Sequence, residues 1–130
     1  MRILIAEDDF SSSMFMKKWL SAYGSCELAM NGIEVLELYT NSIKTNNPYS
    51  LICMDIMMPK VDGMKALELI REMEQTALKS NQDPTIVIMT TALQDEGTIR
   101  EAYQLGCNGY ASKPINLDEF DHVLKELEVI

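Results

Sequence analysis

The sequence predicts an α/β fold in which helices cover both faces of an open five-stranded parallel sheet. Short apolar segments alternate five times with longer segments of helical periodicity along the 130 residues, the order expected of βα units. The apolar segments are continuously apolar, as is typical of strands buried on both faces. No linker, repeat or low-complexity tract divides the chain, so we expect a single domain.

The strands are expected in five short segments. Parallel strands need right-handed crossovers, and the spacing between the segments leaves room for a crossover helix each time. One segment, Cys26–Met30, has a weaker pattern than the others. The four clear segments are Arg2–Ala6, Leu51–Met54, Thr85–Thr90 and Tyr110–Ser112.

The first helix is expected over Ser11–Tyr23. A serine is a favourable N-cap, and Gly24 follows the last residue, where glycine commonly ends a helix. Phe15, Trp19 and Ala22 recur at helical spacing, which predicts that they form the buried face of this helix.

Turn residues bound the second and fourth helices. The second, Ile33–Asn41, follows the pair Asn31-Gly32. The fourth, Asp95–Leu105, ends before Gly106, and glycine readily adopts the left-handed conformation that often closes a helix.

The third and fifth helices have the clearest apolar stripes. The third opens at Asp62-Gly63, and the fifth opens at Asn116, with Glu119 as its capping-box partner. Residues three or four positions apart share one helix face, so each stripe predicts a buried face. The stripes are Met64, Leu67, Ile70 and Met73 in the third helix and Phe120, Val123, Leu124 and Leu127 in the fifth.

The composition excludes several classes of protein. The chain carries 20 acidic and 11 basic residues, a formal charge of −9, so direct binding to nucleic acid is not expected. No apolar run approaches the ~20 residues that span a bilayer. The N-terminus turns acidic at Glu7, too early for a secretory signal. We therefore expect a cytoplasmic protein without membrane insertion.

The cysteines and the histidine exclude further chemistry. Cys26, Cys53 and Cys107 are odd in number and lack Cys-x-x-Cys spacing, which argues against a zinc site or a disulfide framework. We interpret them as small buried apolar residues. His122 is the single histidine, so most Ser-His-Asp and Cys-His schemes are excluded, and we expect it on a helix surface.

Acidic, hydroxyl and ammonium groups follow the predicted strands. Glu7-Asp8-Asp9 come after the first strand, Asp55 after the third, Thr91 after the fourth and Lys113 after the fifth. Ligands of open α/β sheets bind beyond the carboxyl ends of the strands, so we expect these side chains to share one site.

Clustered carboxylates favour a hard divalent cation. Two carboxylates a few ångströms apart repel by about 1 kcal/mol in water and about 4 kcal/mol in a partly shielded cleft, and Mg²⁺ prefers carboxylate, water and phosphate oxygens. Asp55 directly follows an apolar run, where a carboxylate is unfavourable unless it is paired or metal-bound. A carboxylate, a lysine and a hydroxyl beside Mg²⁺ are suited to phosphoryl transfer.

Four motifs together resemble the receiver domain of two-component response regulators, and the resemblance spans the whole chain. Each motif is weak alone, but all four occur in order at matching strand ends. The resemblance implies the flavodoxin-like (βα)5 fold with strand order 2-1-3-4-5. The motifs are Ile3-Leu4-Ile5-Ala6-Glu7-Asp8-Asp9, Met54-Asp55-Ile56-Met57-Met58-Pro59 with Asp62-Gly63, Thr91-Ala92, and Gly109-Tyr110 before Lys113-Pro114.

The resemblance also implies a role for each residue at the strand ends. Asp55 matches the phosphoacceptor, Thr91 the switch hydroxyl and Lys113 the base that pairs with phosphate. Tyr110 matches the aromatic switch residue, and Lys113-Pro114 matches a bond that is usually cis in the family. The implied Mg²⁺ ligands are Glu7, acting mainly through water, Asp8, Asp55 and the backbone carbonyl of Met57, with Asp9 an alternative register for the acidic pair.

The implied function is that of a phosphoacceptor signalling protein, which catalyses only its own Mg-dependent phosphorylation and dephosphorylation. Its phosphodonor would be a sensor histidine kinase or a histidine phosphotransfer protein. Phosphorylation is expected to remodel helix four, strand five and helix five, roughly Asp95–Leu105 and Gly109–Leu127, as a surface for a downstream protein or a second copy. We expect residues 1–130 to form this receiver domain, with no output domain in the chain.

Two apolar residues predict a slow loss of the phosphoryl group. In receivers, the residues two past the phosphoacceptor and two past the switch hydroxyl flank the approach of water. Here they are Met57 and Leu93, neither of which can orient a water molecule. The alternative interpretation is that both only cover apolar surface.

Other classes fit the residues less well. A phosphatase of the haloacid-dehalogenase type needs a second aspartate where Met57 stands, and a pseudo-receiver would lack one of the site residues, none of which is missing. A dinucleotide-binding domain needs Gly-x-Gly-x-x-Gly where Glu7-Asp8-Asp9-Phe10-Ser11 stands. The segments Thr40–Ser50 and Ala77–Pro84 are somewhat long for a receiver, but they precede strands and lie away from the expected site.

Overall fold

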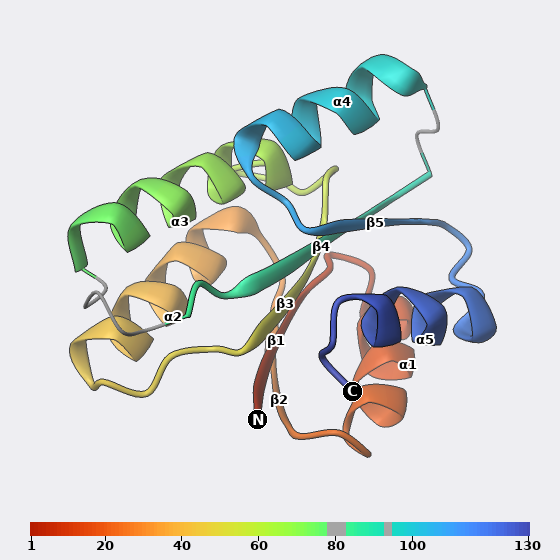
Figure 1. The fold of residues 1–130 in the computed structure, drawn as a ribbon, viewed down its shortest axis with the longest axis horizontal. Coiled ribbons are helices and arrows are strands. Elements are labelled where there is room, and N and C mark those ends of the chain that lie inside the picture. Colours follow the sequence, from red (N-terminus) through yellow and green to blue (C-terminus); the bar gives the residue numbers. More distant parts are fainter. Residues whose placement is uncertain (78–82, 93–94) are drawn as a thin grey trace.

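All five strands run parallel in the computed structural model, which describes residues 1–77, 83–92 and 95–130. Their order is β2-β1-β3-β4-β5, so the predicted fold class and strand order are confirmed. Figure 1 shows the twisted sheet running through the middle of the molecule. The strands are β1 (Arg2–Ala6), β2 (Ser25–Ala29), β3 (Leu51–Asp55), β4 (Ile86–Thr91) and β5 (Gly109–Ser112).

The register brings the carboxyl ends of the strands together at one edge of the sheet. Ala6 pairs with Met54, and Asp55 pairs with Thr90. The amide of Ile56 donates to the carbonyl of Thr90 at 3.0 Å, which extends the ladder through Asp55, one residue beyond the predicted end of the strand. β2 begins and ends one residue earlier than predicted, and β4 begins and ends one residue later than predicted.

Helices cover both faces of the sheet, as predicted. α1 and α5 lie on one face, and α2, α3 and α4 lie on the other (Figure 1). Trp19 of α1 packs edge-on against Phe120 of α5, with ring centroids 5.1 Å apart. The helices are α1 (Phe10–Leu20), α2 (Gly32–Lys44), α3 (Gly63–Ala77), α4 (Glu96–Leu105) and α5 (Leu117–Glu126).

The alternation of side chains along each strand produces two apolar cores. Leu4 and Met54 belong to the core beneath α2, α3 and α4, whereas Ile3 and Cys53 belong to the core beneath α1 and α5. Successive strand residues point to opposite faces, so a strand covered on both faces must be apolar throughout. This explains why the strands were recognisable as continuous apolar runs.

The prediction for the first helix was wrong in its start, its end and its buried face. Asp9, not a serine, is the N-cap, because its carboxylate accepts the amide of Ser12 at 3.0 Å. The buried face consists of Ser13, Met16 and Leu20, whereas Phe15 and Ala22 are exposed and Trp19 is half-buried. Ser13 is small and fully buried although it is polar. A prediction that relies on the spacing of apolar residues assigns such a residue to the surface.

The cap predicted at Asn116 is confirmed, because its side chain accepts the amide of Glu119 at 3.1 Å. Asp95, predicted as the first residue of the fourth helix, is instead the N-cap of α4, and its side chain accepts the amide of Thr98 at 3.0 Å. The predicted stripe of α3 packs into the core, with Leu67 fully buried. α2 is longer than predicted at both ends.

A partly buried ionic network closes the opposite, amino edge of the sheet. The Arg71 guanidinium donates to Glu74 at 2.5 Å, to the carbonyl of Gly106 at 2.9 Å and to Asn108 at 2.8 Å. Glu74 also accepts the amide of Thr85, just before β4, at 2.8 Å. Each carboxylate oxygen of Glu74 has a partner, which offsets the cost of burying the charge.

The remaining predictions concern single side chains and segments. Cys53 and Cys107 are buried and Cys26 is partly buried, and none of the three forms a disulfide. His122 is exposed on α5, and its Nε2 lies 3.0 Å from Oε1 of Glu126. Residues 78–82 of the predicted long segment before β4 lie outside the described residues. In the described part of the chain, no helix is long and apolar enough to cross a bilayer.

Candidate functional site

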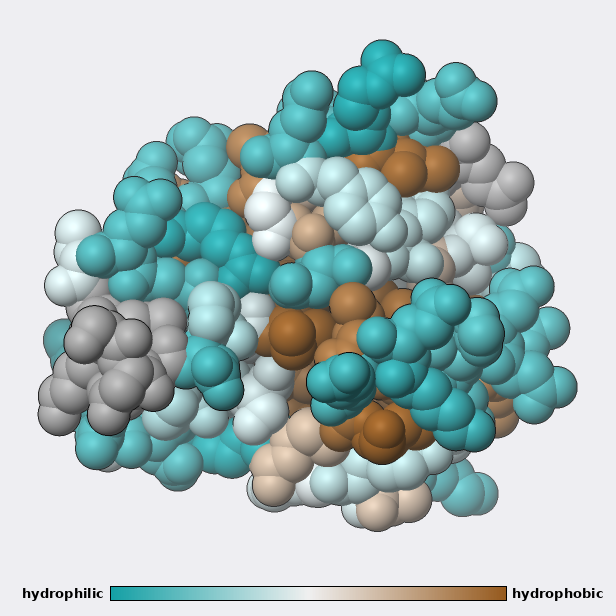
Figure 2. Space-filling view, in the orientation of Figure 1, coloured by the Kyte–Doolittle hydropathy of each residue, from teal (hydrophilic) through white to brown (hydrophobic). Residues whose placement is uncertain are grey.

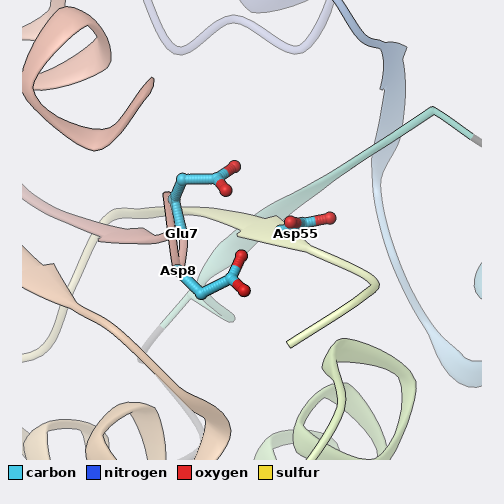
Figure 3. Close-up of side chains that lie close together, drawn as sticks. All are labelled: Glu7, Asp8 and Asp55. Carbon is cyan, nitrogen blue, oxygen red and sulfur yellow. The ribbon is translucent and has the colours of Figure 1, made fainter. Parts of the chain in front are cut away.

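Three carboxylates converge at the carboxyl edge of the sheet. Glu7 and Asp8 directly follow β1, and Asp55 ends the neighbouring strand β3. One oxygen of each side chain lies within 4.8 Å of the others, and Figure 3 shows the Glu7 and Asp8 side chains turned toward Asp55. Glu7 and Asp55 are only 5% and 4% exposed, whereas Asp8 is exposed. This cluster is a set of hard oxygen donors open to solvent on one side.

Lys113 lies between the two buried carboxylates. Its Nζ donates to Asp55 Oδ2 at 2.9 Å and to Glu7 Oε2. Burial raises the pKa of the Glu7 carboxyl above its usual value, although the hydrogen bond from Lys113 opposes the shift. Burial alone would lower the pKa of Lys113, but its hydrogen bonds to Glu7 and Asp55 outweigh this effect and the pKa is raised. Lys113 is therefore a cation at neutral pH and the counterion of the site.

The loop after β3 fixes the other oxygen of Asp55. The amide of Met57 donates to Asp55 Oδ1 at 3.1 Å. Residues 56–62 then turn back, and the amide of Gly63 donates to the carbonyl of Ile56 at 2.8 Å. Both carboxylate oxygens of Asp55 are thus held in place by hydrogen bonds. Met57 itself is 63% exposed.

The side chain of Asp9 does not belong to this cluster. Its side chain caps α1, and its bonds with Ser12 lower the pKa of the Asp9 carboxyl. Its backbone amide donates to Glu7 Oε1 at 3.2 Å, which helps to orient Glu7. Among the described residues, the acidic cluster consists of Glu7, Asp8 and Asp55, the register preferred from the sequence.

Thr91 and Tyr110 lie on the two neighbouring strands. Thr91 ends β4 and is fully buried, and its carbonyl accepts the amide of Lys113 at 2.8 Å. Tyr110 lies on β5 opposite Met89 and is partly buried against the core beneath α2, α3 and α4. Burial raises the pKa of the Tyr110 hydroxyl above its usual value. The peptide bond between Lys113 and Pro114 is cis, as expected.

An apolar cavity beside the cluster was not predicted. It has a volume of about 620 Å³, and its lining includes Phe15, Met16, Pro114 and Ile115 together with Glu7 and Lys113. These residues come from the position just after β1, from α1 and from the segment after β5, so no local pattern in the sequence connects them. Phe15 was predicted to lie on the buried face of the first helix, so its exposed position in the lining of this cavity was missed.

Comparison with known proteins agrees with this geometry. The family profile described as the response regulator receiver domain matches residues 3–125. The chain belongs to this family. A receiver domain is a signalling domain, and the chemotaxis protein CheY of Treponema pallidum is a relative, 32% identical over 135 residues that cover 95% of this chain and 83% of that protein.

Solved receiver domains have the same architecture. The receiver domain of the Saccharomyces cerevisiae response regulator Ssk1, in complex with the phosphotransfer protein Ypd1, is 28% identical, with a TM-score of 0.82 and coverage of 96% of this chain and 87% of that one. The receiver domain of the Arabidopsis thaliana histidine kinase CKI1, complexed with Mg²⁺ and BeF3⁻, is 25% identical, with a TM-score of 0.83 and coverage of 99% and 90%.

The curated relatives are often much longer than this receiver domain. The chain spans 3%, 10%, 53% and 55% of the length of four that it matches. What the family match establishes is therefore the domain and its class, not the activity of a longer protein.

The charge balance of the site predicts the effect of removing its lysine. Replacing Lys113 with Met leaves Glu7 and Asp55 buried without their counterion, and we expect the free energy of unfolding at neutral pH to fall by about 3 kcal/mol. A carboxyl whose pKa is raised on folding binds its proton more tightly in the folded state, so stability falls as pH rises above the ordinary Glu value of 4.5. Protonation in acid removes the charge of the Glu7 carboxyl, which has no counterion in the variant. The loss of stability in Lys113→Met should therefore be smaller in acid than at neutral pH. MgCl2 should also reduce this loss, because Mg²⁺ partly replaces the missing cation.

Urea denaturation with and without MgCl2, at acidic and neutral pH, measures this effect. The matched control is Lys125→Met, because Lys125 is exposed on α5. A Lys113→Met protein as stable as the control at neutral pH would contradict the assignment of Lys113 as the counterion of the two carboxylates.

Proposed function

We propose that residues 1–130 form one receiver domain that accepts a phosphoryl group from a phosphohistidine donor on Asp55. The observation that carries the proposal is the position of Asp55, a buried carboxylate bonded to Lys113 at 2.9 Å with Glu7 and Asp8 beside it. A nucleophile, a cation and a metal-binding cluster in one place are the parts that phosphoryl transfer requires.

The carboxylates of Glu7, Asp8 and Asp55 fit a Mg²⁺ ion, because they are hard oxygen donors that converge within 4.8 Å. The backbone carbonyl of Met57, in the loop that follows Asp55, would complete the protein ligands. When bound, Mg²⁺ would neutralise part of the charge on the phosphoryl oxygens. The Mg²⁺-bound receiver domain of CKI1 supports this choice of ion.

Transfer to Asp55 exchanges one P–N bond for one P–O bond. A carboxylate oxygen of Asp55 attacks phosphorus in line with the donor imidazole, whose nitrogen keeps the electron pair of the broken bond. Lys113, hydrogen-bonded to Asp55 Oδ2, can follow the negative charge onto the phosphoryl oxygens. The domain itself thus contributes the catalytic groups for its own phosphorylation.

A histidine phosphotransfer protein or a sensor histidine kinase is the donor that we propose. The complex of the related Ssk1 receiver domain with Ypd1 supports a donor of this kind. The donor must present its phosphohistidine at the carboxyl edge of the sheet, where Asp55 ends β3.

The first experiment identifies the phosphorylated residue. With Mg²⁺ and a small phosphodonor, the protein should gain one phosphoryl group as an acid-stable, base-labile acyl phosphate. Intact mass spectrometry should detect it in the wild type and in the control Asp118→Asn, whose carboxyl is exposed on α5, and not in Asp55→Ala. An adduct that persists in Asp55→Ala would place the acceptor elsewhere.

We further propose that phosphorylation changes the surface formed by α4, β5 and α5. The phosphoryl oxygens would draw the Thr91 hydroxyl and Lys113 inward and make room for the ring of Tyr110. Figure 2 shows apolar side chains exposed between the hydrophilic surfaces of α4 and α5. A cavity of about 450 Å³ beside β5 is lined by Tyr110, Phe120 and Val123, among others. A downstream protein or a second copy of the chain would bind this surface.

Hydrogen exchange tests where the change occurs. After phosphorylation, amides of α4, β5 and α5 should change their exchange rates, and Asp55→Ala treated with the same donor should show no change. Changes confined to α2 and α3 would refute the proposed surface.

The lifetime of the phosphoryl group tests the role of Met57. Met57 is exposed beside Asp55 and cannot orient an attacking water, so Met57→Asn should shorten the lifetime several-fold. Leu93, the second apolar residue that the sequence suggested, lies outside the described residues. The control is Met14→Asn, at another exposed methionine on α1. Equal decay in both variants and the wild type would mean that Met57 only covers apolar surface.

A further inference from the structure

The pair Asn31-Gly32 opens α2 and lies beneath the loop that follows Asp55. The Asn31 side chain caps the helix by accepting the amide of Glu34 at 2.9 Å. Glu34 in turn accepts the amide of Met30 at 2.6 Å. Gly32 is buried, and these bonds hold the backbone on both sides of it.

The backbone of Val61 packs directly on Gly32. A Cβ added to Gly32 would lie 1.9 Å from the Val61 carbonyl oxygen and 2.6 Å from both the carbonyl carbon and the Cβ of Val61. Ordinary van der Waals contact begins at 3.4 Å, so the two backbones would have to separate by about 1.5 Å, the difference between 3.4 and 1.9. The closest atom, the carbonyl oxygen, and the carbonyl carbon belong to the backbone, which cannot rotate away as a flexible side chain does.

The loop of residues 56–62 connects this contact to the proposed metal site. It begins at Asp55, carries Met57 and ends at Gly63, whose amide donates to the carbonyl of Ile56 at 2.8 Å. A Cβ on Gly63 would lie 2.2 Å from the carbonyl oxygen of Asp55, so the end of the loop also packs on its beginning. In so short a loop, a displacement at Val61 is transmitted to the backbone of Met57.

Helix α2 cannot readily move instead. Val35 and Tyr39, on the same helix, are both fully buried in the core. Moving α2 away would open a gap beneath two large side chains, which costs more than displacing a surface loop. The loop is therefore the part that yields.

We infer that Gly32 is a positioning residue for the metal site: its missing side chain lets residues 56–62 approach α2 closely enough for the Met57 carbonyl and the Asp55 carboxylate to face the same ion. This inference rests on the proposed Mg²⁺ site. It concerns the loop and not the stability of α2, and the two effects can be measured separately.

The experiment is a Mg²⁺ titration of Gly32→Ala, followed by the NMR amide shifts of the site. We expect the affinity to fall by about tenfold, the size of effect seen when groups that support metal ligands are changed. With a small phosphodonor, the maximal rate of Asp55 phosphorylation at saturating Mg²⁺ should remain close to that of the wild type, because the nucleophile and Lys113 are unchanged.

Two control variants separate positioning from stability. Gly97→Ala is the matched substitution, because a Cβ there meets only a carboxylate oxygen of Asp95 at 3.4 Å. Val35→Ala should lower the stability of α2 by opening a cavity, yet leave the Mg²⁺ affinity unchanged. If Gly32→Ala does not fold, Val61→Gly loosens the same contact from the loop side without a clash and should weaken Mg²⁺ binding in the same direction.

The outcomes are distinct. Wild-type affinity in both Gly32→Ala and Val61→Gly, or an equal loss of affinity in Val35→Ala, would overturn the positioning role while leaving the metal site intact. A wild-type protein with no saturable Mg²⁺ site would overturn the proposed metal site and, with it, this inference.

Discussion

The hydrogen-bonded ion pair between Lys113 and Asp55 is the interaction on which the site depends. Asp55 ends a strand whose other residues are all buried and apolar, and burying a carboxylate there is unfavourable without a partner. Lys113 reaches Asp55 from the far side of β4, and it bonds Glu7 as well. One cation therefore compensates two buried carboxylates. Any group that changes the charge at Asp55 would redistribute the hydrogen bonds of Lys113.

The two edges of the sheet handle buried charge differently. At the amino edge, Arg71 and Glu74 pair with each other, and their remaining groups bond Thr85, Gly106 and Asn108. At the carboxyl edge, Lys113 pairs with Glu7 and Asp55, and a third carboxylate, Asp8, lies beside them. The first arrangement is satisfied within the protein and favours rigidity, whereas the second retains excess negative charge and favours a cation from solution. The edge at which we propose phosphorylation is the one left incompletely neutralised.

Much of the fold and of the site could be predicted from the sequence. The strands were recognisable because burial on both faces requires continuous apolar residues, and the cap at Asn116 was recognisable because it depends on neighbours along the chain. The buried face of α1 was mistaken because Ser13 is polar yet fully buried, so its position reflects the space beneath the helix and not its hydropathy. The apolar cavity beside Glu7 was missed because its lining comes from separate elements.

The sequence by itself determined the order of elements, the parallel sheet and the set of polar residues at its carboxyl edge, since period, turn chemistry and burial of strands are local properties. Only the tertiary structure decided how those residues are used. It separated Asp9, which caps α1, from Glu7 and Asp8, which face Asp55. It also placed Val61 on Gly32. Such choices depend on distances between segments remote in the chain, which register and packing fix and local sequence does not.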